Sequence, residues 1–256
     1  MSKFAHPAQR GLSIIELLIA LAISSLLILG ITQIYVDNKS NFFFQQGQSD
    51  NTENARYALL ILEEELRRVG YQIRPDEDPV YAFPAETVGN CSFTAAERIN
   101  FDPNNSRLCL RYQPHLPGLT ACDGIAQPGP PEPYKLPVGS PATLVVDLTF
   151  TGGSLLCNDQ PVFDNIADLQ FEFGVAADGS RQAQAYKNSP AAGDVIHAVR
   201  YAALIRSRFD NIASDTQSPA FAFWQEKYFD NAGATAPDRA LYLATESTIN
   251  LRNLTR

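Results

Sequence analysis

The order of apolar and polar positions divides residues 12–71 into three segments. Residues 12–36 read LSIIELLIALAISSLLILGITQIYV and are almost continuously apolar, whereas residues 37–54 are polar. Since about 20 apolar residues in a helix span the hydrocarbon core of a bilayer, the first segment predicts a transmembrane helix. Ser24, Ser25 and Thr32 are compatible with this prediction, because each hydroxyl can bond back to the preceding helical turn.

The third segment, residues 55–71, reads ARYALLILEEELRRVGY and has the period of an amphipathic helix. Its apolar stripe recurs at spacings of four, three, four and three residues: Ala55, Leu59, Leu62, Leu66 and Val69. Glu64 and Arg68 lie on the opposite face with i,i+4 spacing, and Gly70 is a typical helix stop. Because two heptads are too few for a coiled coil, we expect this stripe to pack on the chain's own globular part.

The rest of the chain has the short, alternating apolar patterns that predict strands. We expect them at residues 98–102, 108–113, 143–151, 167–175, 199–208 and 241–251, the first two forming a hairpin across a Pro-Asn-Asn-Ser turn. Asp178-Gly179 predicts a turn, and residues 118–139, rich in Pro and Gly, predict a long loop. The expected fold class is α+β: a long N-terminal helix, transmembrane in its first half, packed on a mostly antiparallel sheet.

The charge of the chain limits the classes of binding partner, and the cysteine content indicates the redox compartment. The chain has 20 Lys and Arg against 28 Asp and Glu, a net charge of -8, so nucleic acid is a poor partner. Lys3 and Arg10 precede the apolar segment, as on a cytoplasmic flank. All the cysteines follow that segment: Cys91, Cys109, Cys122 and Cys157. Export of this part into an oxidising compartment would make them two disulfides.

Three disulfide pairings are open to four cysteines, and the sequence does not choose among them. Near-neighbour order favours Cys91–Cys109 and Cys122–Cys157, which would close the predicted hairpin and tie the long loop to the strand after Thr143. The spacings of 18, 13 and 35 residues lack the close pairs of a zinc site, and His6, His115 and His197 are isolated. We therefore expect no metal.

Glu16 is the one acidic residue inside the apolar segment. A carboxylate in the membrane costs about 2.5–3.5 kcal/mol on insertion scales, so it is a functional residue by default and needs a cationic partner. A secretory signal peptide would have a shorter apolar run and a small-residue cleavage site, and an uncleaved signal anchor would leave Glu16 unexplained.

Residues 11–21, GLSIIELLIAL, closely resemble the class III leader of type IV pilins and pseudopilins. The resemblance implies that a prepilin peptidase cuts between Gly11 and Leu12 and that Leu12, where most relatives have Phe, becomes the methylated N-terminus. It further implies that Glu16 docks on the N-terminal amine of a neighbouring subunit. Many major pilins have a helix-kinking proline in the membrane half. This chain has none before Pro75, so we expect any melted region near Gly30 or in residues 38–47.

A second resemblance covers the C-terminal half. The segments PVFDNIADLQFEFGV, VIHAVRYAALIRSR and YLATESTINLRNLTR are similar to the minor pilins of the PilW type, in which Leu251-Arg252-Asn253 is a recurrent ending. The implied function is that of a minor pilin that helps initiate a type IV pilus and lies in the pilus or its tip complex. A J-type minor pseudopilin of type II secretion and an adhesive or ligand-binding module displayed on a pilus are the alternatives.

The resemblances divide the chain into a leader (1–11), a transmembrane and filament-core helix (12–36), its periplasmic continuation (37–70) and a globular β-rich domain (71–256). They imply a single-pass protein of the inner membrane that later becomes extracellular in the pilus. The partners they imply are the prepilin peptidase, other minor pilins, the major pilin, the inner-membrane platform protein and the lipid bilayer. The sequence lacks a G-x-S-x-G elbow, a P-loop and a dinucleotide glycine motif, so we expect no enzyme activity and no cofactor.

Overall fold

The computed structural model describes residues 13–127, 129–130, 132, 135, 143–176, 180, 182–191 and 194–254. The predicted cleavage site at Gly11 and Leu12, the predicted Asp178-Gly179 turn and most of residues 128–142 lie outside the described residues. The chain divides into two compact units, Met1–Gln46 and Gly47–Arg256.

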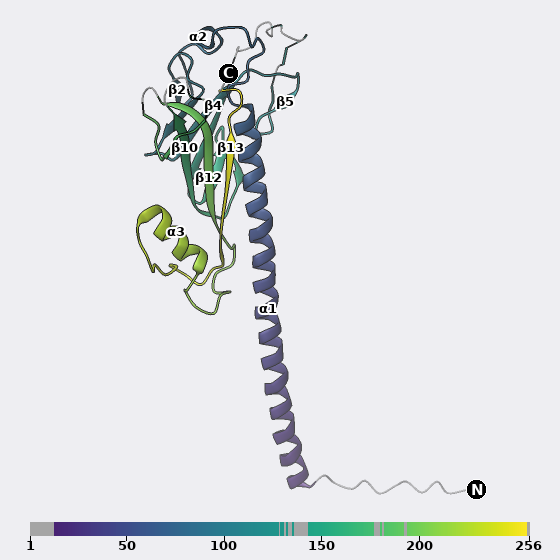
Figure 1. Cartoon of the computed structure of the whole chain (residues 1–256). Helices are drawn as coiled ribbons and strands as arrows, with labels where there is room; N and C mark the ends of the chain where they lie inside the picture. Colours follow the sequence, from purple (N-terminus) through teal and green to yellow (C-terminus); the bar gives the residue numbers. More distant parts are fainter. Residues whose placement is uncertain are drawn as a thin grey trace, which may run out of the picture. The chain divides into compact units, whose positions relative to one another are not determined.

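Helix α1 runs from Ile14 to Arg68, a length of 55 residues, and contributes to both units (Figure 1). It continues as helix through Gly30 and residues 38–47, so neither of the two places where a melted region was expected, if present, is melted. No proline interrupts it, and the hydroxyls of Ser24, Ser25 and Thr32 bond back to carbonyls three or four residues earlier. Among the described helices, α1 is long and apolar enough to cross a membrane, with an 18-residue window of mean hydropathy 2.7.

The second part of α1 packs one face into the core of the larger unit, as its stripe predicts. The buried residues on this part are Gly47, Asn51, Ala55, Ala58, Leu62, Glu65 and Leu66. Leu59 is partly buried against the same core, and its carbonyl accepts a hydrogen bond from the Tyr201 hydroxyl at 3.3 Å. Asn51 donates to the carbonyl of Leu241 at 2.9 Å. Apolar burial and these two hydrogen bonds therefore hold the helix to the strands.

Two larger antiparallel sheets form the rest of this unit and give it an α+β fold. One has the strand order β11-β10-β12-β13, with β10 at Ile166–Ala176, β11 at Ala185–Lys187, β12 at Val195–Arg206 and β13 at Tyr242–Asn250. The other has the order β3-β4-β7-β8-β9, with β3 at Ile99–Asp102, β4 at Arg107–Tyr112, β7 at Leu144–Thr151, β8 at Ser154–Cys157 and β9 at Gln160–Phe163. Short hairpins add β1 (Glu86–Val88) to β2 (Cys91–Phe93), and β5 (Leu119–Thr120) to β6 (Ala126–Gln127).

The predicted strands agree with this topology to within a few residues. Strands β3 and β4 form the predicted hairpin, with Ile99 opposite Leu110. In β10 the alternating apolar residues are buried, as expected: Leu169, Phe171, Phe173 and Val175. Strand β12 begins four residues before its predicted start and ends at Arg206, so Arg208 lies beyond it. The apolar face of β12 and the helix stripe belong to one core cluster.

Helix α3, Pro219–Phe229, was not predicted from the sequence. Ser218 is its N-cap and accepts from the Phe221 N–H, and Pro219 occupies the first turn. Trp224, 1% exposed, packs with Ala202 and Leu204 on the other face of β12. Consequently β12 is buried on both faces, although its sequence predicts only one apolar face. A four-residue helix, α2 at Pro79–Ala82, follows α1.

Candidate functional site

Glu16 lies in the first turn of α1, among side chains that are exposed in the isolated chain. Its apolar neighbours Ile15 and Leu17 are 65% and 52% exposed. A negative charge is favourable at a helix N-terminus, because the N–H groups of the first turn are unpaired and the helix dipole is positive there. This effect offsets only part of the cost of a carboxylate in an apolar environment.

The first positive charge after Glu16 in the sequence is Lys39. The two residues are 23 positions apart on one helix, a rise of about 34 Å at 1.5 Å per residue. Lys39 therefore cannot neutralise Glu16 within the same chain. A partner must come from the segment before Ser13 or from another molecule, and the pairing predicted for Leu12 lies outside the described residues.

The C-terminal end of α1 has a second carboxylate in an apolar setting, which sequence analysis did not single out. Glu65 is 2% exposed, and its carboxylate accepts from the Tyr112 hydroxyl at 3.2 Å and from Arg68 at 3.1 Å. Burial raises the pKa of Glu65 from 4.5 to about 7, against the lowering effects of Arg68 and Tyr112. No local pattern could have found this cluster, because Tyr112 is 47 residues further along the chain.

The segment that ends in Leu251-Arg252-Asn253 lies at the same end of α1. Leu251 is 2% exposed in the core. The Asn253 amide donates to the carbonyls of Arg67 and Val69, both at 3.2 Å. These carbonyls belong to the last helical turn and the residue after it, where intrahelical donors are lacking. The ending that the sequence analysis noted as recurrent therefore caps the long helix.

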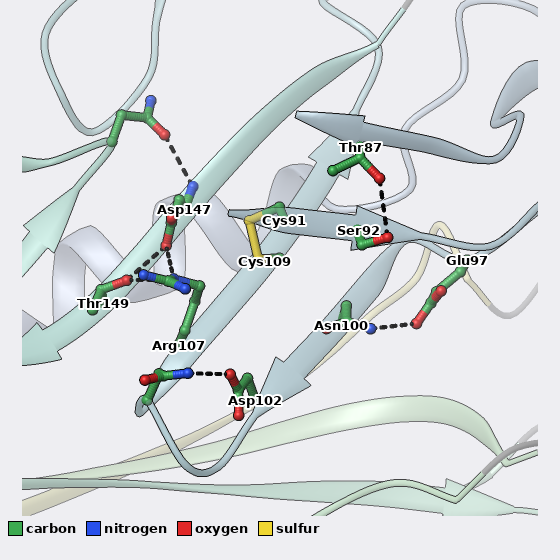
Figure 2. The surroundings of a disulfide bond; sticks show 12 residues. Thr87, Cys91, Ser92, Glu97, Asn100, Asp102, Arg107, Cys109, Asp147 and Thr149 are labelled. Carbon is green, nitrogen blue, oxygen red and sulfur yellow. Dashed lines mark hydrogen bonds and ion pairs between the residues drawn. A yellow bond between two sulfur atoms is a disulfide. The ribbon is translucent and has the colours of Figure 1, made fainter. Parts of the chain in front are cut away.

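The four cysteines form two disulfides in the order that the sequence favours. Figure 2 shows Cys91 of β2 joined to Cys109 of β4, with a Cα–Cα distance of 5.7 Å. Cys122 of the β5–β6 hairpin is joined to Cys157 of β8, with a Cα–Cα distance of 5.9 Å. Asp147 lies beside the first disulfide and binds Arg107 and Thr149 (Figure 2). Cys91, Cys109 and Asp147 are close enough to hold a metal, but a disulfide offers no thiolate ligand.

The two histidines of the described residues differ in their surroundings, and His115 lies near Arg68. The His115 ring packs edge-on against Tyr71 at 5.4 Å, and burial lowers its pKa. His197 is 4% exposed in β12. The structure thus brings Glu65, Arg68 and Tyr112 together, and it leaves Glu16 separate from every charged group described in its own unit.

Comparisons with known proteins agree with the sequence motifs. Residues 139–253 match the family model of type IV pilus-assembly protein W, and residues 6–32 match that of the prokaryotic N-terminal methylation motif. The search of curated proteins gave no match. Among solved structures, a type IV-like pilin from Thermus thermophilus has a TM-score of 0.45 and 12% identity, covering 82% of this chain and 97% of that chain. Likeness of this degree carries no argument about function.

Proposed function

Because the chain belongs to the type IV pilin-like proteins and is a minor pilin of the PilW type, we propose that it helps to initiate pilus assembly and lies in the pilus or its tip complex. Its role as a structural subunit rests on two matches in different parts of the chain, the methylation motif at residues 6–32 and the pilus-assembly family at residues 139–253. The second match favours a pilus over the filament of a type II secretion system.

The observation that carries the proposal is the carboxylate of Glu16 at the start of an exposed apolar helix, with no charged partner among the described residues of its unit. Prepilin peptidase cuts between Gly11 and Leu12 and methylates Leu12. One turn of helix then separates the new amine from Glu16. The carboxylate docks on the amine of a neighbouring subunit, because in an apolar environment a charge gains strongly from an opposite charge nearby.

In this proposal α1 first anchors the subunit in the inner membrane, with the globular domain in the periplasm, and later enters the extracellular filament. The platform protein, the major pilin and other minor pilins are its assembly partners. The side chains of the larger unit act by shape and surface rather than by catalysis. The two disulfides support that role, since they hold the β1–β2 and β5–β6 hairpins to strands β4 and β8 of the five-stranded sheet.

Glu16→Ala tests the docking role, with Glu53→Ala as the control because Glu53 is an exposed carboxylate of α1 outside the apolar segment. Both variants should insert in the membrane and be processed, and mass spectrometry should place the mature N-terminus at methylated Leu12. Glu16→Ala should be recovered in sheared filaments about tenfold less than the wild type, the equivalent of 1.4 kcal/mol. Glu53→Ala should be recovered normally.

Two results would contradict the proposal. An intact Met1, or a cut beyond Val36, would exclude a processed pilin. Normal filament recovery of Glu16→Ala would exclude the docking role and leave the family assignment intact.

A further inference from the structure

Strand β3 forms one edge of the five-stranded sheet, because the strand order is β3-β4-β7-β8-β9. In an antiparallel pair, every second residue turns its N–H and C=O groups towards the partner strand. The Arg111 N–H donates to the Arg98 carbonyl at 3.0 Å, so position 98 faces β4. Asn100 therefore also faces β4, whereas the main-chain groups of Ile99 and Phe101 point to the free edge.

The edge groups of Ile99 and Phe101 have no partners within the described part of the chain, where no hydrogen bond uses the N–H or C=O of either residue. Ile99 is 5% exposed, and the ring of Phe101 is fixed by contacts with Phe171 and Phe173 of β10. Two donors and two acceptors are therefore held in place along the edge. Such a row of unpaired main-chain groups is a template on which another strand can pair.

A cavity of about 790 Å³ lies beside this edge. Its apolar lining combines β3, the start of β12 and the segment after β13, and includes Ile99, Phe101, Val195, Ile196 and Leu254. The volume is within the range of roughly 300–1,000 Å³ that is usual for binding cavities. Because side chains alternate between the two faces of an extended peptide, every second residue of such a peptide could contact this apolar lining.

Three charged side chains also line the cavity: Glu97, Arg98 and Asp194. Both carboxylates are engaged, since Glu97 accepts hydrogen bonds from its neighbours and Asp194 binds Lys187 at 2.8 Å. Arg98 pairs with no carboxylate among the residues that the structure describes, and burial together with the neighbouring Arg111 guanidinium lowers its pKa. A carboxylate placed beside Arg98 would therefore gain a charge-assisted hydrogen bond without displacing another anion.

We propose that this cavity is a docking site for an extended peptide segment of another polypeptide, which pairs with the free edge of β3 and places a carboxylate on Arg98. Main-chain hydrogen bonds to Ile99 and Phe101 supply the affinity, and apolar side chains at alternate positions contact Ile196 and Leu254. The carboxylate belongs either to an acidic side chain or to the C-terminus of the peptide. The strand from Arg98 to Phe101 spans about 10 Å, so about four peptide residues cover the site.

An array of random peptides of about seven residues, each with a free and with an amidated C-terminus, tests the site on the full chain in detergent micelles. The tightest binders should combine a carboxylate with alternating apolar residues, and the two end groups show which source supplies the carboxylate. N-methylation of every second amide should weaken a binder about tenfold in one register and leave it unchanged in the other. The reason is that only alternate amides of an added strand face β3.

Two further measurements locate the peptide. In amide NMR spectra of the wild type, the Ile99 and Phe101 protons should move downfield on saturation, whereas the Asn100 proton, which already bonds to β4, should move less. Arg98→Gln should weaken peptides that carry the carboxylate about tenfold and leave their neutral analogues unchanged. Arg107→Gln is the matched control and should change neither, because Arg107 pairs with Asp147 and does not line the cavity.

The site is overturned if no peptide of the array moves the Ile99 and Phe101 protons, or if methylation in the two registers has equal effects. Equal loss of affinity in Arg98→Gln and Arg107→Gln also overturns it. Self-association that moves the same two protons without peptide would assign the edge to a second copy of the chain instead. The wild-type measurements hold even if Arg98→Gln fails to fold. None of them requires a filament, so failure of this site and failure of the proposed function are distinguishable.

Discussion

The two halves of helix α1 have the same backbone conformation and opposite side-chain environments. Leu27 in the first half is 60% exposed in the isolated chain, whereas Leu62 in the second half is 1% exposed. The first half is apolar on all sides, as expected of a helix whose surroundings are lipid or other helices. The second half is apolar on one face, because its partner is the chain's own sheet. The periodicity of apolar residues thus predicts the environment of each half. The first half is suited to lipid or other helices, and the second half to packing one face on the sheet.

Each half also has one carboxylate in an apolar setting. Glu65 finds its partners within the chain, in Arg68 and Tyr112. Glu16 has no such partner among the described residues of its unit, and Lys39 is about 34 Å away along the helix. Burial of Glu65 therefore serves the fold of one chain, whereas the partner proposed for Glu16 belongs to another molecule.

Matched leucine substitutions should separate the two halves most strongly. Leu62→Ala removes a fully buried side chain and should lower the free energy of unfolding of the larger unit by about 2–5 kcal/mol. Leu27→Ala should leave it unchanged, because Leu27 is 60% exposed and is not one of the buried core residues. Urea unfolding in micelles, followed by fluorescence of the single tryptophan, buried Trp224, measures both. Equal effects of the two substitutions would show that the halves are not energetically distinct.

Removal of a disulfide should have the next largest effect on the free energy of unfolding of the larger unit. In the chain-entropy model, the loops of 35 and 18 residues correspond to about 4 and 3 kcal/mol respectively. Replacing Cys122 and Cys157 by Ser should therefore destabilise the larger unit somewhat more than replacing Cys91 and Cys109.

The Cys122–Cys157 double variant should also increase hydrogen exchange at amides 119–126, because it removes the covalent tether of the β5–β6 hairpin to the rest of the unit. A non-reduced peptide map of the wild type checks the pairing first. Crossed linkages such as Cys91–Cys122 would contradict it, and unchanged stability of both double variants would show that neither loop closure matters.

Local patterns in the sequence predicted α1 and six of the thirteen strands in the described part of the chain, whereas β5 and β6 lie where a long loop was expected. The apolar run and the stripe from Ala55 to Val69 predicted a helix in each half of α1, and alternation predicted the strands β10 and β12. These signals are local, because periods of 3.6 and 2 residues report burial on one face of an element. The position of Glu16 relative to Gly11 was equally readable, since both lie in one short motif.

Other features depend on residues far apart in the sequence. Glu65 is the last of three consecutive glutamates and is followed closely by two arginines, a sequence typical of a solvated helix face, but the β5–β6 hairpin and Tyr112 cover it. Helix α3 was missed although Ser218-Pro219 is a recognisable helix start, because its aromatic residues also suit a strand. The role of Asn253 as a cap for α1 connects positions 184 and 186 residues apart, which no local pattern encodes.

The smallest predicted effect on stability comes from replacing a glycine of α1 by alanine. Two glycines of this helix, Gly47 and Gly30, should respond differently. An Ala side chain favours helix by about 1 kcal/mol over Gly at either position. At Gly47 the new methyl carbon would lie 2.7 Å from Ile212 Cδ1 and 3.4 Å from Leu241 Cδ1, whereas at Gly30 nothing lies within 4 Å. Overpacking of a core costs about 1–3 kcal/mol, which exceeds the gain in helix propensity.

Gly47→Ala should therefore destabilise the larger unit by about 1 kcal/mol net, with Ile212 absorbing part of the clash because its methyl group is the end of a flexible side chain. Gly30→Ala should leave the urea transition of Trp224 unchanged and should not reduce helical ellipticity. The sign at Gly47 is the informative quantity, since helix propensity and core packing oppose each other only there. Stabilisation by Gly47→Ala would mean that this part of α1 packs less tightly on the domain than its burial indicates. The half of α1 that is packed on the core would then begin further along the helix, nearer Asn51.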